Sequence, residues 1–189
     1  LRWQNTQVLY LKLGGLDAIG GPMMDNMYHS AWAWAGDTPF RYTKLVAADW
    51  GGTRTPMVIS WPKGIKADKK PRSQFLHVND IAPTLYEILK IPLPDIVSGH
   101  AQDPIDGKSF ADTFSNADAV GKKKTQYFEI LGSRGIYHDG YLASTFGPRT
   151  PWVAKGIDLT EWDPNDDVWE LFDVAKDFSL TDDLANKMP

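Results

Sequence analysis

The stretch KLVAADWGGTRTPMVISWP, residues 44–62, decides the fold class. Its second half, PMVISW at 56–61, is a compact apolar run with a β-branched centre, bounded by glycines and a proline. Such runs are typical of buried parallel strands. Residues 75–91 follow with apolar side chains at helical spacing, Asp80 at the front and a proline just beyond the end. A loop, a strand, a loop and a helix in this order predict an α/β domain.

The segments beside this core give further elements. An Asp-Thr-Pro sequence at 37–39 predicts a helix over about 39–49, stopped by the glycine pair at 51–52. Residues 92–123 are rich in Pro, Gly and Asp and predict a long surface excursion. We therefore expect the end of a large α/β domain in residues 1–118.

The remaining residues, 119–189, predict a small antiparallel subdomain. Short β-prone runs alternate with turn dipeptides between 125 and 146, and Asp139-Gly140 is a strong hairpin signal. VWELFDV at 168–174 predicts another strand, and LTDDLANK from 180 predicts the start of a final helix.

Composition excludes several classes of protein. The chain has 189 residues, no cysteine and a net charge of −4, which excludes disulfides and Cys-ligated zinc. The lysine clusters at 66–70 and 122–124 indicate solvated loops, so we expect no nucleic-acid partner. No segment is long and apolar enough for a membrane span. The start lacks Met and a signal-peptide pattern, which predicts a piece of a longer polypeptide and leaves the compartment and the oligomeric state undecided.

Spacing rejects the common catalytic motifs. Residues 14–22 lack the Lys and Ser or Thr of a phosphate loop, and residues 163–174 lack the turn glycine and the last glutamate of a calcium loop. The four histidines are not spaced as zinc ligands, and Ser60 lacks the flanking glycines of a nucleophile elbow. His77 and Asp80 flank a helix start and are interpreted as capping residues.

Two candidate binding features remain from the residues alone. Lys44 lies near the end of the expected helix that leads into the buried strand. There it would project into the crevice at a strand end and hold an anionic group as a point charge, or simply complement the helix C-terminus. Trp32 and Trp34 either wall a cleft or belong to the core.

Six blocks in order resemble one protein family. They are DTPFRYTK, GGTRTPMVISWP, HVNDIAPTLYEIL, KKTQYFEI, RGIYHDGYLAST and VWELFDVAKDFS. Together they resemble the sulfatases, particularly the long bacterial arylsulfatases. The resemblance implies a partial alkaline phosphatase-like fold: the end of a large α/β domain, then a small antiparallel sheet with a terminal helix.

The resemblance also implies a chemistry. Sulfatases hydrolyse sulfate esters through a formylglycine, made from Cys or Ser in a C/S-x-P-x-R motif, and a calcium ion held by Asp and Asn. This chain contains neither that motif nor an Asp-Asn-Gly block. We expect calcium and formylglycine in the full-length protein, no metal bound by this chain, a small-molecule sulfate ester as substrate, and no activity from the chain alone.

Matching positions carry the expected roles of single residues. The sulfatase lysine that precedes the glycine pair contacts the substrate sulfate, and Lys44 matches it. The AWAWAGD segment also matches, which keeps Trp32 and Trp34 as candidate cleft residues.

Two more residues have expected supporting roles. Arg54 matches the arginine of the Gly-Gly-x-Arg block, and we expect it to orient the site, paired with Asp49 or Asp80. Asp49 would repel a sulfate unless it is turned away or paired.

Two alternatives stay open. A phosphate or phosphonate monoester hydrolase of the same superfamily would use Lys44 equally well, because both esters are tetrahedral anions. A non-catalytic binding module derived from a sulfatase would need no upstream chemistry.

Overall fold

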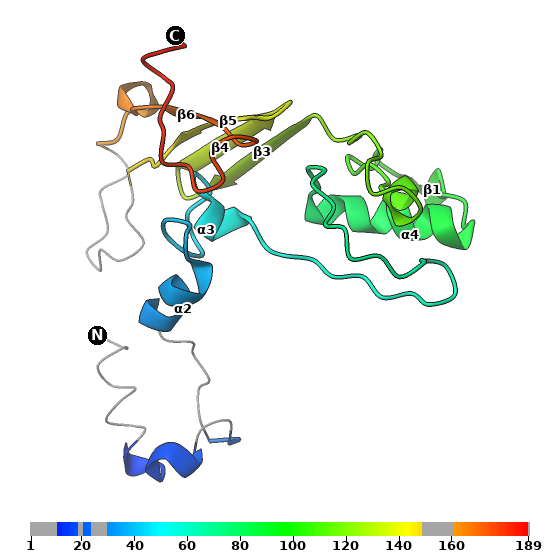
Figure 1. Cartoon of the computed structure of the whole chain (residues 1–189), viewed down its shortest axis with the longest axis horizontal. Helices are drawn as coiled ribbons and strands as arrows, with labels where there is room; N and C mark the ends of the chain where they lie inside the picture. Colours follow the sequence, from blue (N-terminus) through cyan, green and yellow to red (C-terminus); the bar gives the residue numbers. More distant parts are fainter. Residues whose placement is uncertain (1–10, 19–20, 24–29, 149–160, 189) are drawn as a thin grey trace. The chain divides into compact units, whose positions relative to one another are not determined.

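A computed structural model describes residues 11–18, 21–23, 30–148 and 161–188 (Figure 1). The chain forms two compact units, Leu1–Thr38 and Pro39–Pro189. The described elements of the first unit are a 3-10 turn, η1 (Gly15–Ala18), and the helix α2 (Ser30–Asp37). None of the described helices is long and apolar enough to cross a membrane.

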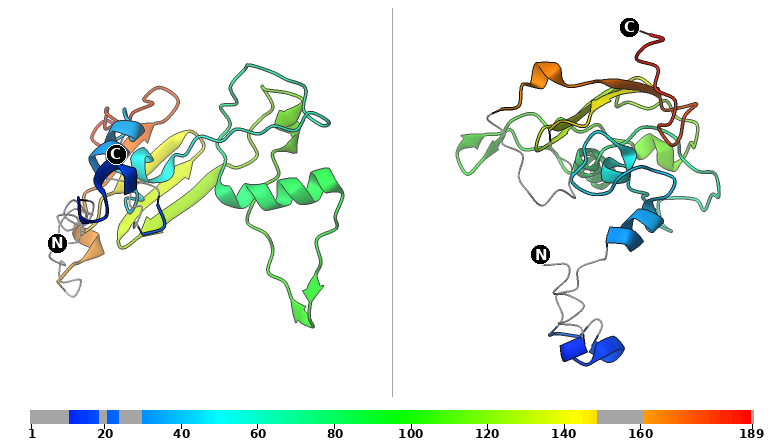
Figure 2. Two further views of the ribbon diagram at one scale, coloured as in Figure 1. Left: turned by 90° about the horizontal axis from the view of Figure 1, so that it is seen from below. Right: turned by 90° about the vertical axis from the view of Figure 1, so that its left-hand side faces the viewer.

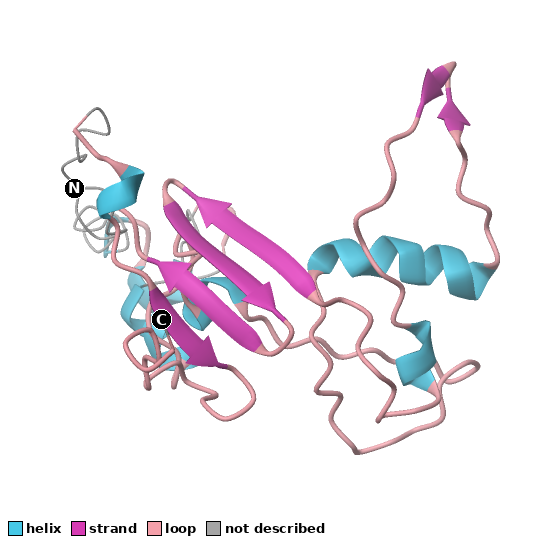
Figure 3. Cartoon of the chain, turned by 90° about the horizontal axis from the view of Figure 1, so that it is seen from above, coloured by secondary structure: helices cyan, strands magenta, loops and turns pink. Residues whose placement is uncertain are grey.

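A four-stranded antiparallel sheet dominates the second unit (Figure 3). Its strands lie in the order β3 (Thr125–Ile130), β4 (Ser133–His138), β5 (Tyr141–Thr145) and β6 (Glu170–Asp173). Asp139 and Gly140 join β4 to β5 with φ values of 44° and 99°. Positive φ at both turn residues matches the right-handed twist of the strands, and the predicted hairpin is confirmed.

The core lies against this sheet. Tyr137, Leu142 and Phe172 are neighbours across β4, β5 and β6 and are at most 9% exposed. Trp50 and Leu180 complete the buried cluster. Cross-strand packing of large side chains is what stabilises such a sheet.

A helical segment precedes the sheet in the sequence. The 3-10 turn η2 (Val78–Asp80) leads into α4 (Ile81–Leu89), which ends at Lys90 in a left-handed conformation with φ 54°. The predicted helix and the capping roles of His77 and Asp80 are confirmed. The His77 ring accepts the Asn79 N–H, and the Asp80 carboxylate accepts the His77 N–H.

The predicted surface excursion after α4 contains two small elements. One is a hairpin of β1 (Ile96–Val97) and β2 (His100–Ala101), which Figure 2 shows at the tip of a long loop. The other is the 3-10 turn η3 (Ala111–Phe114). A last 3-10 turn, η4 (Pro164–Asp166), precedes β6.

The predicted helix over 39–49 is wrong. Residues 39–49 form turns, and Tyr42 and Leu45 have φ values of 63° and 77°, which a right-handed helix does not accommodate. The short helix α3 (Trp50–Thr53) begins instead at the glycine pair, because the Asp49 side chain accepts the Gly51 N–H and caps it. Tertiary contacts of the loop have overridden its local preference.

Two other predicted elements are also wrong. Residues 56–61 form no strand, and Val58 is 93% exposed, because none of the described segments pairs with this run. The predicted helix from residue 180 is a single turn at 185–187, since Asp177 and Asp183 bind the backbone N–H groups of this segment in a series of side-chain turns.

Candidate anion-binding loop

Lys44 lies at the exposed apex of the loop 39–49. Its ε-ammonium has no hydrogen-bond or ion-pair partner among the residues that the structure describes. Tyr42 and Leu45 on either side have positive φ, so the backbone turns sharply both before and after the lysine. The side chain therefore carries an uncompensated charge at a tightly turned position.

The glycine pair holds this loop against α3. A Cβ atom on Gly51 would collide with the carbonyl oxygen of Arg41, and one on Gly52 would collide with the carbonyl oxygen of Val46. Only glycine permits the backbone to approach so closely. The glycine pair therefore does not end a helix, as its sequence suggests. It lets loop 39–49 lie against the short helix α3.

Buried residues fix the far end of the loop. Val46, Ala47 and Ala48 are at most 5% exposed, and the Ala48 N–H donates to the hydroxyl of Ser133 on β4 at 3.1 Å. The loop thus rests on the sheet through residues two to four positions after Lys44. A loop that is constrained on both sides presents its exposed side chain from a preorganised backbone.

Asp49 is turned away from the solvent and paired. It is 1% exposed, and its carboxylate accepts a hydrogen bond from the Arg41 guanidinium at 2.9 Å. Burial raises the pKa of Asp49, and the positive charge of Arg41 opposes that rise. Arg41 also contacts the Glu170 carboxylate of β6 at 3.3 Å. The negative charge of Asp49 is therefore balanced within the loop.

Arg54 does not pair with either carboxylate that we expected. Asp49 pairs with Arg41, and Asp80 pairs with Lys123. The guanidinium carbon of Arg54 instead lies 4.2 Å from the ring centre of Phe178. Burial among aromatic rings lowers the pKa of Arg54, and such stacking is a stabilising cation–π arrangement.

Trp32 and Trp34 lie on α2, in the first unit, and are 68% and 52% exposed. Residues two apart on an α-helix are separated by about 200° around its axis, so these rings face nearly opposite directions. Neither is a core residue in the described chain. They do not form one wall together.

Residues that the sequence alone did not single out complete the loop. Arg41 links Asp49 to Glu170, and an opening of about 290 Å³ lies beside this network. Its lining consists of Arg41, Tyr42, Ala48, Asp49, Phe146, Val168 and Glu170. The position of Arg41 three residues before Lys44 is visible in the sequence, but its partner Glu170 is 129 residues away.

The described residues do not fit a metal or a formylglycine. No group of three or more His, Asp or Glu side chains within them is arranged to hold a metal ion. The chain has no cysteine, and none of its serines lies in an S-x-P-x-R sequence. Among the described residues, the candidate site therefore consists of the Lys44 cation and the residues that support its loop.

Comparison with known proteins gives the family. The family model described as Sulfatase matches residues 16–91. An uncharacterised sulfatase of Schizosaccharomyces pombe is 31% identical over 169 residues, covering 86% of this chain and 27% of the relative. A sulfatase of Formosa agariphila is 25% identical over 145 residues, covering 74% of this chain and 24% of the relative. The chain thus spans about a quarter of the length of these relatives.

Solved structures give the fold. A protein from a study of glycosaminoglycan metabolism by Bacteroides thetaiotaomicron matches with a TM-score of 0.55 and 22% identity, covering 79% of this chain and 29% of that one. The protein Ps i-CgsB matches with a TM-score of 0.52 and 19% identity, covering 79% and 28%. These likenesses show part of an alkaline phosphatase-like fold. With the family match and the two sequence relatives, they establish that this chain belongs to the sulfatase family.

Proposed function

We propose that this chain is part of a sulfate ester hydrolase of arylsulfatase type and that Lys44 binds the sulfate group of its substrate. The observation that carries the proposal is the uncompensated ammonium on a loop fixed by Arg41–Asp49 and by the glycine pair. Charged groups stabilise a transition state best when their supporting structure is already in place before reaction. In Lys44 the constrained backbone provides that support, and the exposed side chain extends from it.

Lys44 has a defined chemical task in this proposal. Its ammonium neutralises the sulfate oxygens in the bound substrate and the negative charge that develops on the leaving oxygen. The formylglycine nucleophile and the calcium ligands would come from other residues of the full-length protein. This chain alone is then inactive, because one point charge does not replace a nucleophile.

The other candidate residues have supporting roles. Asp49 positions the loop through Arg41, and Arg54 holds the C-terminal turn at Phe178 against the same region. Trp32 and Trp34 remain candidate substrate contacts, but their opposite directions on α2 mean that one substrate ring would stack on only one of them.

The same proposal includes the domain division. Residues 1–118 belong to the large α/β domain, and residues 119–189 form the small antiparallel subdomain. The buried pair of Asp80 and Lys123, 3.1 Å apart, would then connect the two across their boundary.

One observation bears on the alternative of an independent binding module. Met57, Val58 and Ile59 are 46%, 93% and 42% exposed in the described chain. A module that folds alone buries its apolar strands, whereas a strand of a larger sheet awaits its neighbours. The exposure therefore supports a role inside a larger sulfatase domain.

Steady-state kinetics of the full-length protein test the proposal. Lys44→Ala should lower kcat/KM for an aryl sulfate by about 100-fold, as expected for the loss of one transition-state contact, and Lys44→Arg should restore part of it. The control is Lys90→Ala, which removes an exposed lysine at the end of α4.

The same measurements with a matched phosphate ester separate sulfatase from phosphatase. The proposal expects faster turnover of the sulfate. Wild-type kinetics for Lys44→Ala, or a preference for the phosphate, would contradict it.

A further inference from the structure

Two lysine-rich segments of the second unit are far apart in sequence. Residues 63–72 and 117–124 carry eight of the 20 basic side chains of the chain and only two of its 24 acidic ones. The rest of the chain is strongly acidic, so positive charge is concentrated in these two segments. We call them together the basic strip.

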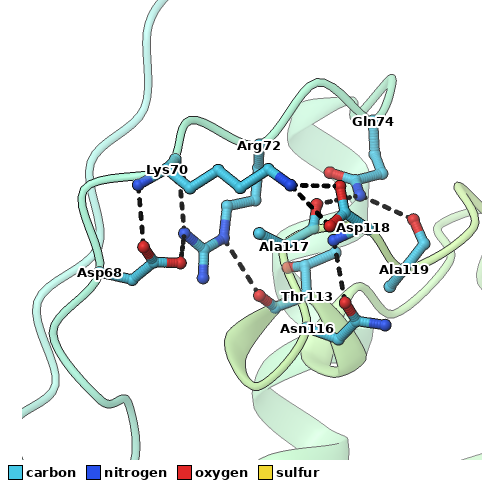
Figure 4. Close-up of polar contacts among 9 residues, drawn as sticks. All are labelled: Asp68, Lys70, Arg72, Gln74, Thr113, Asn116, Ala117, Asp118 and Ala119. Carbon is cyan, nitrogen blue, oxygen red and sulfur yellow. Dashed lines mark hydrogen bonds and ion pairs between the residues drawn. The ribbon is translucent and has the colours of Figure 1, made fainter.

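The structure brings the two segments side by side (Figure 4). The Gln74 amide donates to the carbonyl oxygens of Ala117 and Ala119 at 2.9 and 2.7 Å. The Lys70 ammonium donates to both carboxylate oxygens of Asp118 at 2.6 Å. The strip is therefore one surface and not two independent loops.

Its backbone is held in place by its few acidic groups. Asp68 accepts the Lys70 backbone N–H at 2.9 Å and the Arg72 guanidinium at 2.8 Å. Arg72 also donates to the Thr113 carbonyl oxygen at 3.2 Å. Asp68 and Asp118 thus hold the loops and pair with Arg72 and Lys70. Lys122, Lys123 and Lys124 pair with carboxylates outside the strip, so the uncompensated charge of the strip lies on the remaining lysines of residues 63–72.

Three lysines of the strip are free. Lys63, Lys66 and Lys69 are exposed and have no hydrogen-bond or carboxylate partner within the described part of the chain. Unpaired ammonium groups repel one another unless an anion lies among them. A ligand with several negative charges would relieve that repulsion.

We propose that the basic strip binds a sulfated polysaccharide. The substrate is then a polymer, and the strip holds a part of it other than the ester that reacts. This rests on the proposed sulfatase function, because such a polymer repeats the ester that Lys44 would bind. Lysine suits the ligand: its flexible, hydrated point charge adapts to sulfates on a variable chain.

The composition of the strip favours a polysaccharide over a nucleic acid. Residues 63–72 and 117–124 contain no aromatic side chain on which a base would stack. Arg72, the one arginine of the strip, is already bound to Asp68 and to a carbonyl oxygen. No group suited to reading a base is left over in the strip.

A charge-matched pair of variants tests the proposal in the full-length protein. Lys66→Gln with Lys69→Gln removes two free charges of the strip. Lys176→Gln with Lys187→Gln removes two lysines that are 84% and 63% exposed and lie after β6. Binding of dextran sulfate, with neutral dextran as blank, is measured at several salt concentrations.

We expect the strip variant to bind dextran sulfate about tenfold more weakly at low salt and with a smaller salt dependence. With two fewer lysine contacts, binding releases fewer counterions from the polymer. The control pair should stay within about twofold of wild type. Unchanged binding by the strip variant, an equal loss in the control pair, or tighter binding of single-stranded DNA than of dextran sulfate would overturn the proposal.

Hydrolysis of a small aryl sulfate separates this proposal from the proposed function. The strip variant should hydrolyse it like wild type, whereas Lys44→Ala should hydrolyse it about 100-fold less efficiently and keep dextran sulfate binding. Strip-dependent binding by a wild-type protein without hydrolysis would refute the sulfatase function and the assignment of the polymer as substrate. Intact hydrolysis with strip-independent binding would refute the strip alone.

Discussion

The four-stranded sheet and the segment 56–61 contain the same kinds of residue and have opposite fates. Leu142 and Phe172 are each 1% exposed, while Val58 is 93% exposed. The strands of the sheet find partners through turns of two residues or through the return of β6 beside β5. None of the described strands pairs with segment 56–61. Burial thus depends on which neighbours the chain supplies, and not on apolar character alone.

Helix α4 shows both situations at once. Thr84 on one side is 2% exposed, and its hydroxyl accepts the Phe110 N–H at 3.1 Å. On another side, three apolar residues at helical spacing are between 39% and 60% exposed: Ile81, Leu85 and Leu89. We infer that this face, like segment 56–61, packs against the remainder of the sulfatase domain.

The sharpest test of the comparison is a pair of truncations. Phe172→Ala should lower the free energy of unfolding by about 3–5 kcal/mol, because it leaves a cavity in a packed core. Val58→Ala should change it by less than about 0.5 kcal/mol, because the side chain is already in water. Urea unfolding of the 189-residue chain measures both, and equal effects would break the comparison.

The next test concerns the ion pair between the start of α4 and the segment that leads into the sheet. Asp80 and Lys123 are 0% and 5% exposed and 3.1 Å apart, and they join the start of α4 to the segment that leads into β3. Lys123→Met should cost about 3–5 kcal/mol by leaving a buried charge unpaired. The double variant with Asp80→Asn should recover part of that loss, as a double-mutant cycle would show. Additive losses would mean that the pair does not couple the start of α4 to the segment before β3.

The smallest expected effect lies within the sheet region. The Asp183 carboxylate accepts the backbone N–H groups of Leu171 and Ala185, both at 2.9 Å, and these bonds lower the pKa of Asp183. A lowered folded-state pKa stabilises the protein above the unfolded value of about 3.9 and loses that contribution as the pH falls through the folded value.

Asp183→Asn should therefore be slightly less stable than wild type at pH 7 and equally stable at the acid end of the range. Melting temperatures across the pH range check this. A difference that persists undiminished in acid would show that the charge of Asp183 is not its cause.

Local signals predicted part of this fold well. The turn residues Asp139 and Gly140 specify the β4–β5 hairpin by their own backbone preferences. His77 and Asp80 specify the start of α4 through contacts within four residues. Each signal acts over a distance that a sequence pattern reveals.

The failures have a common cause in contacts between distant residues. The loop 39–49 is bent by its packing on α3 and on Ser133, and segment 56–61 needs strands that the described chain does not provide. At the candidate site, Lys44 is readable from its position before the glycine pair. The partners of Asp49 and Arg54 are not readable in this way. Arg41, the partner of Asp49, was one of several nearby cations, and Phe178, the partner of Arg54, lies 124 residues further along the chain.

The reactivity of Lys44 offers the most direct test that this chain supplies a cation to a sulfate site. In the full-length protein, an amine-reactive reagent would label exposed lysines, and mass spectrometry would measure the labelling rate with and without inorganic sulfate. We predict that sulfate slows the labelling of Lys44 and leaves that of Lys90 unchanged. Equal labelling of Lys44 in both conditions, or equal protection of Lys90, would contradict the sulfate-binding role.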